Sequence, residues 1–351
     1  MGLGEHSAAV GRRKLFIVGS VIIAILIGVG VGIGVGLTRN ADSSTSGGTS
    51  SSDHNTPPVI LCSRVHTRSS LFPNCNNSLG NVISDIQLIS QLTTRIRLYG
   101  ADCNQSALVL EAIKQTKTNV SVYLGIYNVP DDHTAYTRQR DLVRNALQTY
   151  GTEHVLGVTV GNEFMLNYLN ANGGTEPNSA IGDQGAQILV ADIADTRKML
   201  SDIGVSLPVG NSDAGYYFNT KVLEASDYGM SNIHAWFANT TVQDAAAWTA
   251  RYFEETNVRP AAQLANRPKM YIAEAGWPTH SSDEGNKNNG GSDASIANLQ
   301  IFLDTFVCQA NQNGTGYFYF EFSDEPWKDV MYGGVEGWWG LFPFQPDFKG
   351  H

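Results

Sequence analysis

Two glutamates each end a short apolar run, and carboxylates in such places are candidates for acid–base or nucleophilic chemistry. Glu163 closes VLGVTVGNE (155–163). Glu274 lies in KMYIAEAG (269–276), one residue before a Gly-Trp-Pro turn. A single glutamate at a strand end is commonly a solvated rim residue. Two of them, each at the carboxyl end of its own predicted strand, fit a site in which carboxylates flank a bond, as cleavage of a glycosidic bond requires.

The elements that must position these acids alternate between strand and helix patterns from about residue 80 onward. Each predicted strand is short and continuous, as in a parallel sheet buried on both faces. An opening strand near 59–66 and strands at 94–100, 120–127, 155–163, 207–213, 231–237, 269–276 and 316–322 predict an α/β fold, a (β/α)8 TIM barrel. A doubly wound open sheet is the alternative, but the glycine-rich phosphate turn that it needs is absent from the sequence.

In such a barrel, functional residues gather at the carboxyl ends of the strands. Glu163 ends the fourth predicted strand and Glu274 the seventh. These two strands lie on opposite sides of the barrel, so the two carboxylates are expected to face each other across its mouth.

Several stretches resemble glycoside hydrolase family 17, the β-1,3-glucanases. VTVGNE and YIAEAGWPT are similar to its two signature segments, and RLYGADCNQ, NIHAWF and YFYFEFSDEPWK resemble its fungal branch. The resemblance covers roughly residues 75–345. It implies a (β/α)8 barrel and retaining cleavage of β-1,3-glucan, with Glu163 as acid/base and Glu274 as nucleophile. No cofactor and no metal are expected.

Other residues of these motifs are candidates for the substrate cleft. Asn162 is expected to donate its amide to a sugar hydroxyl, and Trp277 to present a flat face to a sugar ring. Glu321, or its neighbours Asp324 and Glu325, is expected to hold hydrogen bonds around the nucleophile, whereas His234 is interpreted as structural. The further cleft candidates, each with barrel packing as an alternative, are Tyr99, Trp236, Phe237 and Trp327.

The first 58 residues differ in composition from the rest. Residues 15–37 form an uncharged run of 23 residues, long enough to cross a bilayer, and the basic residues of the tail 1–14 precede it. Residues 38–58 read as a flexible Ser/Thr/Pro-rich stalk, and 59–351 as the catalytic barrel. This order predicts a single-pass type II protein of the cell membrane with an extracellular catalytic domain; secretion after signal-peptide cleavage is the alternative.

The net charge argues against nucleic acid as a partner. The expected partners are glucan and the membrane. The chain has a net charge of −10, and the part beyond residue 52 carries −12 without a basic cluster. Nucleic-acid binding is therefore not expected. Oligomeric state is not indicated.

The cysteines and sequons fit an oxidising compartment. Of Cys62, Cys75, Cys103 and Cys308, none forms a C-x-x-C pair, which favours disulfides over metal binding. Cys75 follows the first predicted strand and Cys103 the second, so a Cys75–Cys103 bond is predicted. The family resemblance leaves Cys308 either free or paired with Cys62. N-x-S/T acceptors occur at Asn76, Asn104, Asn119, Asn239 and Asn313.

Two other functions share these features. A β-1,3-glucanosyltransferase would use the same covalent intermediate, and the sequence does not separate transfer from hydrolysis, or endo from exo action. A non-catalytic cell-surface glucan-binding protein is the third reading, and the retention of both glutamates disfavours it. The opening stretch VILCSRVHTRSS departs from the family pattern, which leaves the cleft near the first strand undefined.

Overall fold

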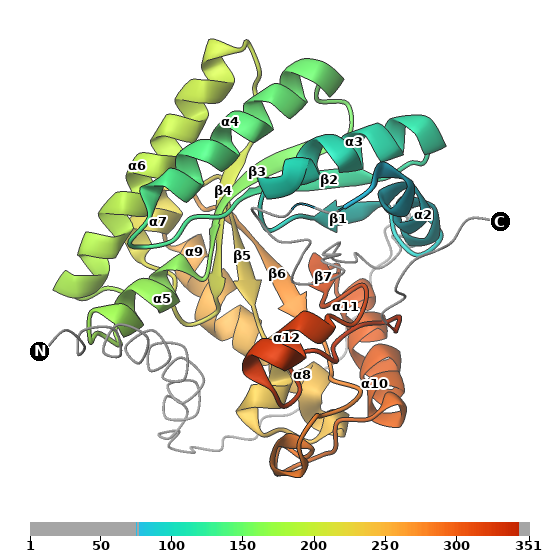
Figure 1. Ribbon diagram of the computed structural model, residues 1–351. Helices are drawn as coiled ribbons and strands as arrows, with labels where there is room; N and C mark the ends of the chain where they lie inside the picture. Colours follow the sequence, from blue (N-terminus) through green and yellow to red (C-terminus); the bar gives the residue numbers. More distant parts are fainter. Residues whose placement is uncertain (1–74, 76, 344–351) are drawn as a thin grey trace, which may run out of the picture. The chain divides into compact units, whose positions relative to one another are not determined.

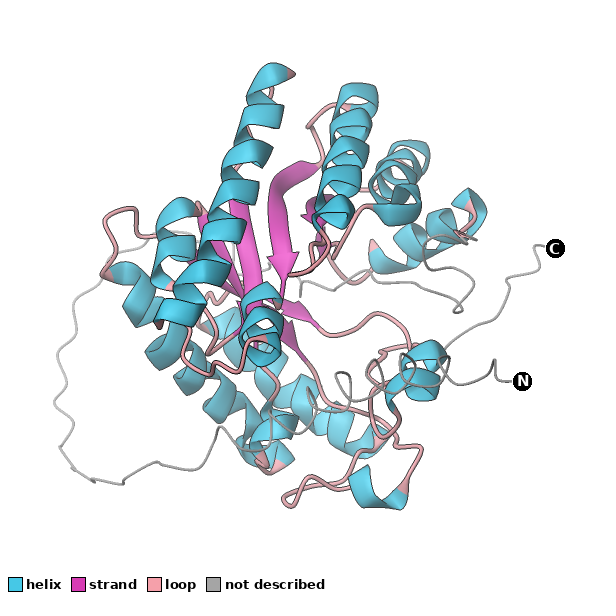
Figure 2. Ribbon diagram, turned by 60° about the vertical axis from the view of Figure 1, so that its left-hand side comes forward, coloured by secondary structure: helices cyan, strands magenta, loops and turns pink. Residues whose placement is uncertain are grey.

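The computed structural model describes residue 75 and residues 77–343, in which a parallel sheet lies inside a surround of helices (Figure 1; Figure 2). The sheet has seven strands in the sequential order β1 to β7, all paired in parallel. This order has no reversal point, so the doubly wound alternative is wrong. The strands are β1 (Arg95–Arg97), β2 (Ser121–Ile126), β3 (Val155–Asn162), β4 (Val209–Ala214), β5 (Tyr228–Asn232), β6 (Lys269–Ala275) and β7 (Tyr317–Tyr319).

Helical segments connect successive strands and pack outside the sheet, which is the TIM-type arrangement. The α-helices are α2 (Leu79–Ile89), α3 (Gln105–Thr116), α4 (His133–Tyr150), α5 (Phe164–Ala171), α6 (Ala180–Asp202), α7 (Thr220–Ala225), α8 (Val242–Phe253), α9 (Arg259–Ala262), α10 (Ile296–Phe302), α11 (Cys308–Gln312) and α12 (Pro326–Tyr332). The shorter 3-10 and π turns are η2 (Asp102–Asn104), η3 (Ala235–Ala238), η4 (Glu254–Val258), η5 (Glu284–Asn286) and η6 (Leu303–Val307).

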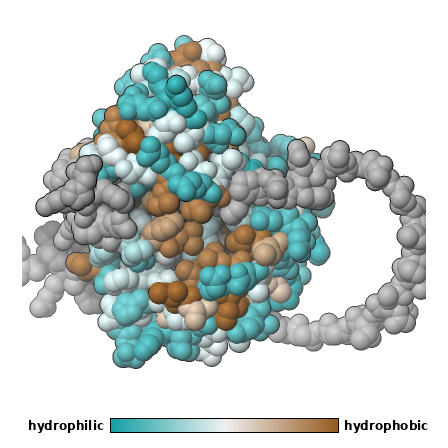
Figure 3. Space-filling view, turned by 90° about the vertical axis from the view of Figure 1, so that its right-hand side faces the viewer, coloured by the Kyte–Doolittle hydropathy of each residue, from teal (hydrophilic) through white to brown (hydrophobic). Residues whose placement is uncertain are grey.

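The core has two parts because side chains of a strand alternate between the two faces of the sheet. Ile96 and Leu98 belong to the large cluster between the sheet and the helices, so Arg97 between them faces the barrel interior. A small cluster that includes Tyr123 and Phe318 fills that interior. Among residues 77–343, few large hydrophobic side chains are exposed. Figure 3 shows one face on which hydrophobic residues gather near the centre, with hydrophilic ones around them.

A β-bulge turns the end of β3 toward the interior. Val160 pairs with Asn211, but Asn162 pairs with Ser212, so β3 carries one extra residue, Gly161. Gly161 has a φ of +85°, a conformation that glycine adopts without the penalty of a Cβ. The extra residue keeps Asn162 on the inner face instead of sending it toward the helices.

A second bulge lies in β6. Ser231 pairs with Ile272, but Asn232 pairs with Glu274, so β6 gains Ala273 relative to β5. Ala273 already faces the interior cluster. Strict alternation would turn Glu274 outward, and the bulge re-aims its carboxylate to the interior.

The strand predictions are confirmed for six segments in approximate position, and one is wrong. The predicted strand 231–237 is displaced: β5 ends at Asn232, and the chain turns into η3 from Ala235. The last predicted strand, 316–322, is shorter than expected and covers Tyr317–Tyr319. Helices α5, α7 and α12 were not predicted, because they are too short for a clear helical period.

Several predictions fall outside the described residues: the opening strand 59–66, the tail 1–14, the apolar run 15–37 and the stalk 38–58. Within residues 77–343, no helix combines the length and the apolar character that a membrane crossing needs.

The predicted Cys75–Cys103 disulfide is present and closes a separation of 28 residues, with 4.9 Å between the Cα atoms. It ties the segment before α2 to the loop after β1. Cys308 has a free, exposed thiol, and Cys62 lies outside the described residues. Four of the sequon asparagines are exposed, as an acceptor must be (Asn104, Asn119, Asn239 and Asn313), and Asn76 is not among the described residues.

Candidate active site

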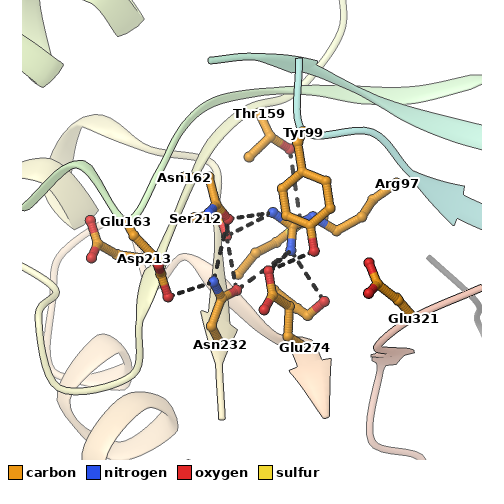
Figure 4. Close-up of polar contacts among 12 residues, drawn as sticks. Arg97, Tyr99, Thr159, Asn162, Glu163, Ser212, Asp213, Asn232, Glu274 and Glu321 are labelled. Atoms are coloured by element: carbon orange, nitrogen blue, oxygen red, sulfur yellow. Dashed lines mark hydrogen bonds and ion pairs between the residues drawn. The ribbon is translucent and has the colours of Figure 1, made fainter. Parts of the chain in front are cut away.

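Arg97 of β1 is the centre of a polar network that links five strands (Figure 4). Its side chain is 1% exposed. Nη2 donates to Asn162 Oδ1 over 2.9 Å and to Ser212 Oγ over 3.1 Å. Nη1 lies 3.5 Å from Asn232 Oδ1 and 3.4 Å from Glu274 Oε1. A buried guanidinium needs such acceptors. Because its NH donors lie in a rigid plane, Arg97 holds residues of β3, β4, β5 and β6 in fixed positions relative to one another.

Glu274 is buried and held at both carboxylate oxygens. The Tyr99 hydroxyl donates to Oε1 over 2.7 Å, and His234 Nε2 lies 3.0 Å from Oε2. Burial alone would raise the pKa of Glu274. The hydrogen bond and charge of His234, the charge of Arg97 and the Tyr99 hydroxyl outweigh it and lower the pKa, which keeps Glu274 ionised.

Glu163 directly follows β3 and precedes α5. Its φ of +54° is left-handed, unlike the backbone conformation of a strand or a helix. Its Oε1 accepts from Asn232 Nδ2 over 3.0 Å. Burial, with the negative charge of Glu274 as a further cause, raises the pKa of Glu163 to about 7. The site therefore holds one carboxyl group that is partly protonated near neutral pH and one that is ionised.

Asp213, the residue after Ser212 in β4, supports the segment that carries Glu163. Its carboxylate accepts from the backbone amides of Met165 and Leu166 over 2.8 and 3.3 Å, at the start of α5. Burial and then the charge of Glu163 raise the pKa of Asp213 well above its ordinary value. The protonated form of Asp213 is therefore favoured.

The predicted cleft residues fall into two groups. Tyr99 and Asn162 lie in the network around the two glutamates, as Figure 4 shows. Phe237 is half-buried and packs near His234 and Trp339, with ring centroids 5.9 and 5.8 Å apart. Trp327, also half-buried, lies on α12.

Trp277 is not a wall of the cleft. Its side chain is 0% exposed, its indole NH donates to Asp293 O over 3.1 Å, and its ring packs against Trp236 at 5.3 Å. Trp236 is buried as well. The Gly-Trp-Pro turn after Glu274 therefore anchors β6 in the core, and the expectation that Trp277 and Trp236 present faces to a sugar is wrong.

Glu321 has a different partner from the one expected. It is 0% exposed, and Lys328 Nζ donates to its Oε2 over 3.0 Å, while Lys328 also pairs with Glu325. Burial and then the charge of Glu325 raise the pKa of Glu321 well above its ordinary value. This group anchors α12 beside the site, so direct substrate contact by Glu321 is not supported.

Sequence reasoning missed three contributors. Arg97, Ser212 and Asn232 lie within predicted strands, and the inward parity of Arg97 between Ile96 and Leu98 was the available signal. His234 was interpreted as a structural residue inside a strand. The strand placement is wrong, because His234 lies beyond β5, where it contacts Glu274.

No metal site is found in the described residues, where no cluster of three or more His, Cys, Asp or Glu side chains is arranged to hold an ion.

The parallel barrel and its two inward carboxyl groups with opposite pKa shifts are those of a glycoside hydrolase. A family model for the BtgE/BtgC glycoside hydrolase domain matches residues 65–340, so the chain belongs to this family. The resemblance to glycoside hydrolase family 17 inferred from the motifs is confirmed.

One relative is the glucan endo-1,3-beta-glucosidase btgC of Emericella nidulans, 33% identical over 283 residues that cover 77% of this chain and 42% of that protein. The chain spans about two fifths of the length of the curated relatives it matches.

Solved structures share the fold. A glycoside hydrolase family 17 beta-1,3-glucanosyltransferase from Rhizomucor miehei superposes with a TM-score of 0.64 at 22% identity, covering 82% of this chain and 94% of that chain. An endo-laminarinase from Formosa gives a TM-score of 0.65 at 20% identity, covering 82% and 84%. At these identities the likeness supports the barrel fold alone.

Proposed function

We propose that the chain cleaves β-1,3-glucosidic bonds of glucan by double displacement, with Glu274 as nucleophile and Glu163 as acid/base. The observation that carries the proposal is that the pKa values of two carboxyl groups in one network are shifted in opposite directions. The two groups are linked because Asn232 contacts both Glu163 and Arg97, and Arg97 contacts Glu274. The endo-1,3-beta-glucosidase relatives support glucan as the substrate, as does the complex of a Rhizomucor miehei active-site mutant with laminaritriose.

In the first step, a carboxylate oxygen of Glu274 attacks the anomeric carbon while the glycosidic C–O bond breaks, and protonated Glu163 gives its proton to the leaving oxygen. The product is a glycosyl ester on Glu274. In the second step, water attacks the anomeric carbon, Glu163 takes the proton of that water, and Glu274 leaves as a carboxylate.

Asn162 is suited to bind the sugar next to the scissile bond. Its Oδ1 accepts from Arg97 and Asn232, which turns its amide nitrogen away from the guanidinium and fixes the side chain in one orientation. A fixed amide donor beside the nucleophile can hold a sugar hydroxyl without further loss of side-chain entropy.

The test is incubation of the full chain with laminari-oligosaccharides, with products separated by size and their anomeric configuration followed by NMR. Shorter products that first appear as the β-anomer support retaining hydrolysis. First-formed α-anomers contradict the double displacement, and no conversion of any laminari-oligosaccharide contradicts the substrate assignment.

Transfer to a second glucan is the alternative outcome of the same chemistry, because a sugar hydroxyl replaces water in the second step. Products longer than the starting oligosaccharide identify it in the same experiment. No turnover, combined with retained glucan binding, would identify a non-catalytic glucan-binding protein.

We also propose that residues 15–37 anchor the chain in the cell membrane, with the barrel outside. The support is the uncharged run itself and the Arg12-Arg13-Lys14 flank that precedes it. Protease added to intact cells is expected to remove the barrel and leave the N-terminus protected. Barrel released into the medium with a new N-terminus near residue 40 would show cleavage and secretion instead.

A further inference from the structure

The two carboxylate oxygens of Glu274 have different surroundings. Oε1 accepts from the Tyr99 hydroxyl over 2.7 Å and lies 3.4 Å from Arg97 Nη1 (Figure 4). Oε2 lies 3.0 Å from His234 Nε2, which is the one donor to it within the part of the chain that the structure describes. A carboxylate has about four lone-pair sites, two on each oxygen. Both sites of Oε1 are therefore occupied, and one site of Oε2 is free.

The two oxygens also face different parts of the barrel. Arg97 faces the barrel interior and is 1% exposed, so Oε1 lies on the closed side of the carboxylate. His234 lies beyond the end of β5, and its side chain is 13% exposed. In barrels of this type, substrates arrive at the carboxyl ends of the strands. The free lone pair of Oε2 is therefore on the side from which a sugar approaches.

His234 serves Oε2 as a donor, because an ionised carboxylate has no hydrogen to give. Nε2 must then carry a proton. Nδ1 is buried, and no hydrogen-bond partner for it exists among the described residues, so nothing there favours a proton on Nδ1 in place of Nε2. Phe320 and Trp339 hold the ring edge-to-face, with centroids 5.2 and 5.0 Å away. A donor fixed in this way stays in place when the carboxylate changes its bonding.

We propose that Oε2 is the oxygen that attacks the anomeric carbon, and that His234 is a catalytic residue of the second step. The proposal rests on the glucan-cleaving function above and deepens it. In the first step, Oε2 forms a bond to the anomeric carbon. The electron pair of the broken glycosidic bond goes to the leaving oxygen, which takes the proton of Glu163. Oε2 is then the bridging oxygen of the ester, and Oε1 is its carbonyl oxygen, still held by Tyr99.

The hydrogen bond from His234 differs in strength between the two forms of Glu274. A hydrogen bond to a charged oxygen is stronger than one to a neutral oxygen, and the bridging oxygen of an ester is neutral. In the second step, water attacks the anomeric carbon and gives a proton to Glu163. The electron pair of the breaking C–Oε2 bond returns to Oε2, where negative charge develops next to Nε2. His234 therefore favours cleavage of the ester over its formation.

The test follows dinitrophenyl β-laminaribioside on the full chain by stopped flow. Its leaving group departs without a proton, so the burst of dinitrophenolate reports ester formation and the steady state reports ester cleavage. His234→Phe keeps an aromatic ring but has no donor. The ratio of the burst rate constant to the steady-state rate constant is expected to rise about 10- to 100-fold, as loss of a hydrogen bond to a charged group implies. Mass spectrometry of acid-quenched protein is expected to show a larger share of the glycosyl ester.

Three further variants separate the hydrogen bond from packing. His234→Ala needs no room for a larger ring and is expected to give the same rise. His234→Gln restores a side-chain NH donor near the position of Nε2 and is expected to recover most of the wild-type ratio. His133→Phe is the matched control, because it makes the same change in a side chain that is 62% exposed at the start of α4. It is expected to leave both rate constants unchanged, and circular dichroism checks the fold of each variant.

The possible outcomes separate this proposal from the proposed function. If the wild type turns over and both donor-free variants keep its ratio, the assignment of Oε2 is overturned and glucan cleavage stands. A fall of both rate constants by the same factor overturns the assignment as well, because a merely structural role has that result. A rise of the ratio in Tyr99→Phe, but not in the His234 variants, would make Oε1 the attacking oxygen. Absence of wild-type turnover on every laminari-oligosaccharide would overturn the proposed function, and the assignment with it.

Discussion

The hydroxyl of Tyr99 donates to Oε1 of Glu274 over 2.7 Å, and the Arg97 guanidinium carbon lies 4.4 Å from the centre of the Tyr99 ring. The loop after β1 thereby reaches across to β6. One tyrosine both stacks on the central cation of the network and holds the proposed nucleophile. The protonation state of the site therefore depends on residues that are far apart in the sequence.

Glu274→Gln is expected to abolish turnover of laminarin and to leave the fold intact, because the amide keeps the size of the side chain but cannot attack. Glu163→Ala is expected to slow laminarin cleavage and to spare an aryl glucoside whose leaving group needs little protonation. Initial rates on both substrates, with circular dichroism as the fold control, check this. Wild-type activity of both variants on laminarin would show that the assignment is wrong.

The pKa of Glu163, about 7, predicts that kcat/KM falls as pH rises through that value, because the general acid loses its proton. Burial favours the protonated, neutral form of Asp213, so Asp213→Asn is expected to leave the basic limb in place. The Asn oxygen still accepts from the α5 amides. A pH–rate profile checks this, with exposed Asp304→Asn as the control, and a basic limb that moves to lower pH in Asp213→Asn contradicts it.

Tyr99→Phe removes a hydrogen bond that lowers the pKa of Glu274, so this pKa rises. The acidic limb of the kcat/KM profile is expected to move to higher pH, because Glu274 must be ionised to attack. A hydrogen bond to a charged group contributes about 1.5–3 kcal/mol, which corresponds to a loss of about 10- to 100-fold in kcat. A loss of rate without a shift of the limb would indicate that Tyr99 acts on the substrate only.

Arg97→Met removes the guanidinium beside the buried Glu274 carboxylate and the donor to Asn162 and Ser212. Such a break is expected to lower the free energy of unfolding by about 3–5 kcal/mol. Urea denaturation measures it. Arg259→Met, which removes an exposed ion pair with Glu254, is the control and is expected to change stability little. Equal effects of both substitutions would show that the network does not stabilise the fold.

The sequence predicted those parts of the site that are indicated by the residues next to them in the chain. Glu163 and Glu274 end apolar runs, and the strand-helix alternation indicated the barrel that brings strand ends together. The bulges at Gly161 and Ala273 carry no such signal, because each depends on the register with a neighbouring strand. The parity of Arg97 between Ile96 and Leu98 was a signal, but its acceptors on the other strands follow from those registers and had none.

Trp277 illustrates the opposite error. The position of an aromatic residue just after the proposed nucleophile predicts a cleft wall, but the turn after β6 directs the Trp277 ring into the core. Adjacency in sequence does not fix the face on which a side chain lies once the strand has ended.

Because Arg97 on β1 contacts residues of β3, β4, β5 and β6, no contiguous half of the chain contains a complete centre. A cut in the connection between α4 and β3 would leave the guanidinium on one piece and both glutamates on the other. Neither piece would have the chemistry of the whole, and co-expression would restore it only through correct pairing of β2 with β3. The barrel is thus suited to a split-enzyme reporter, in which the proposed glucan cleavage would measure how much of the chain has reassembled.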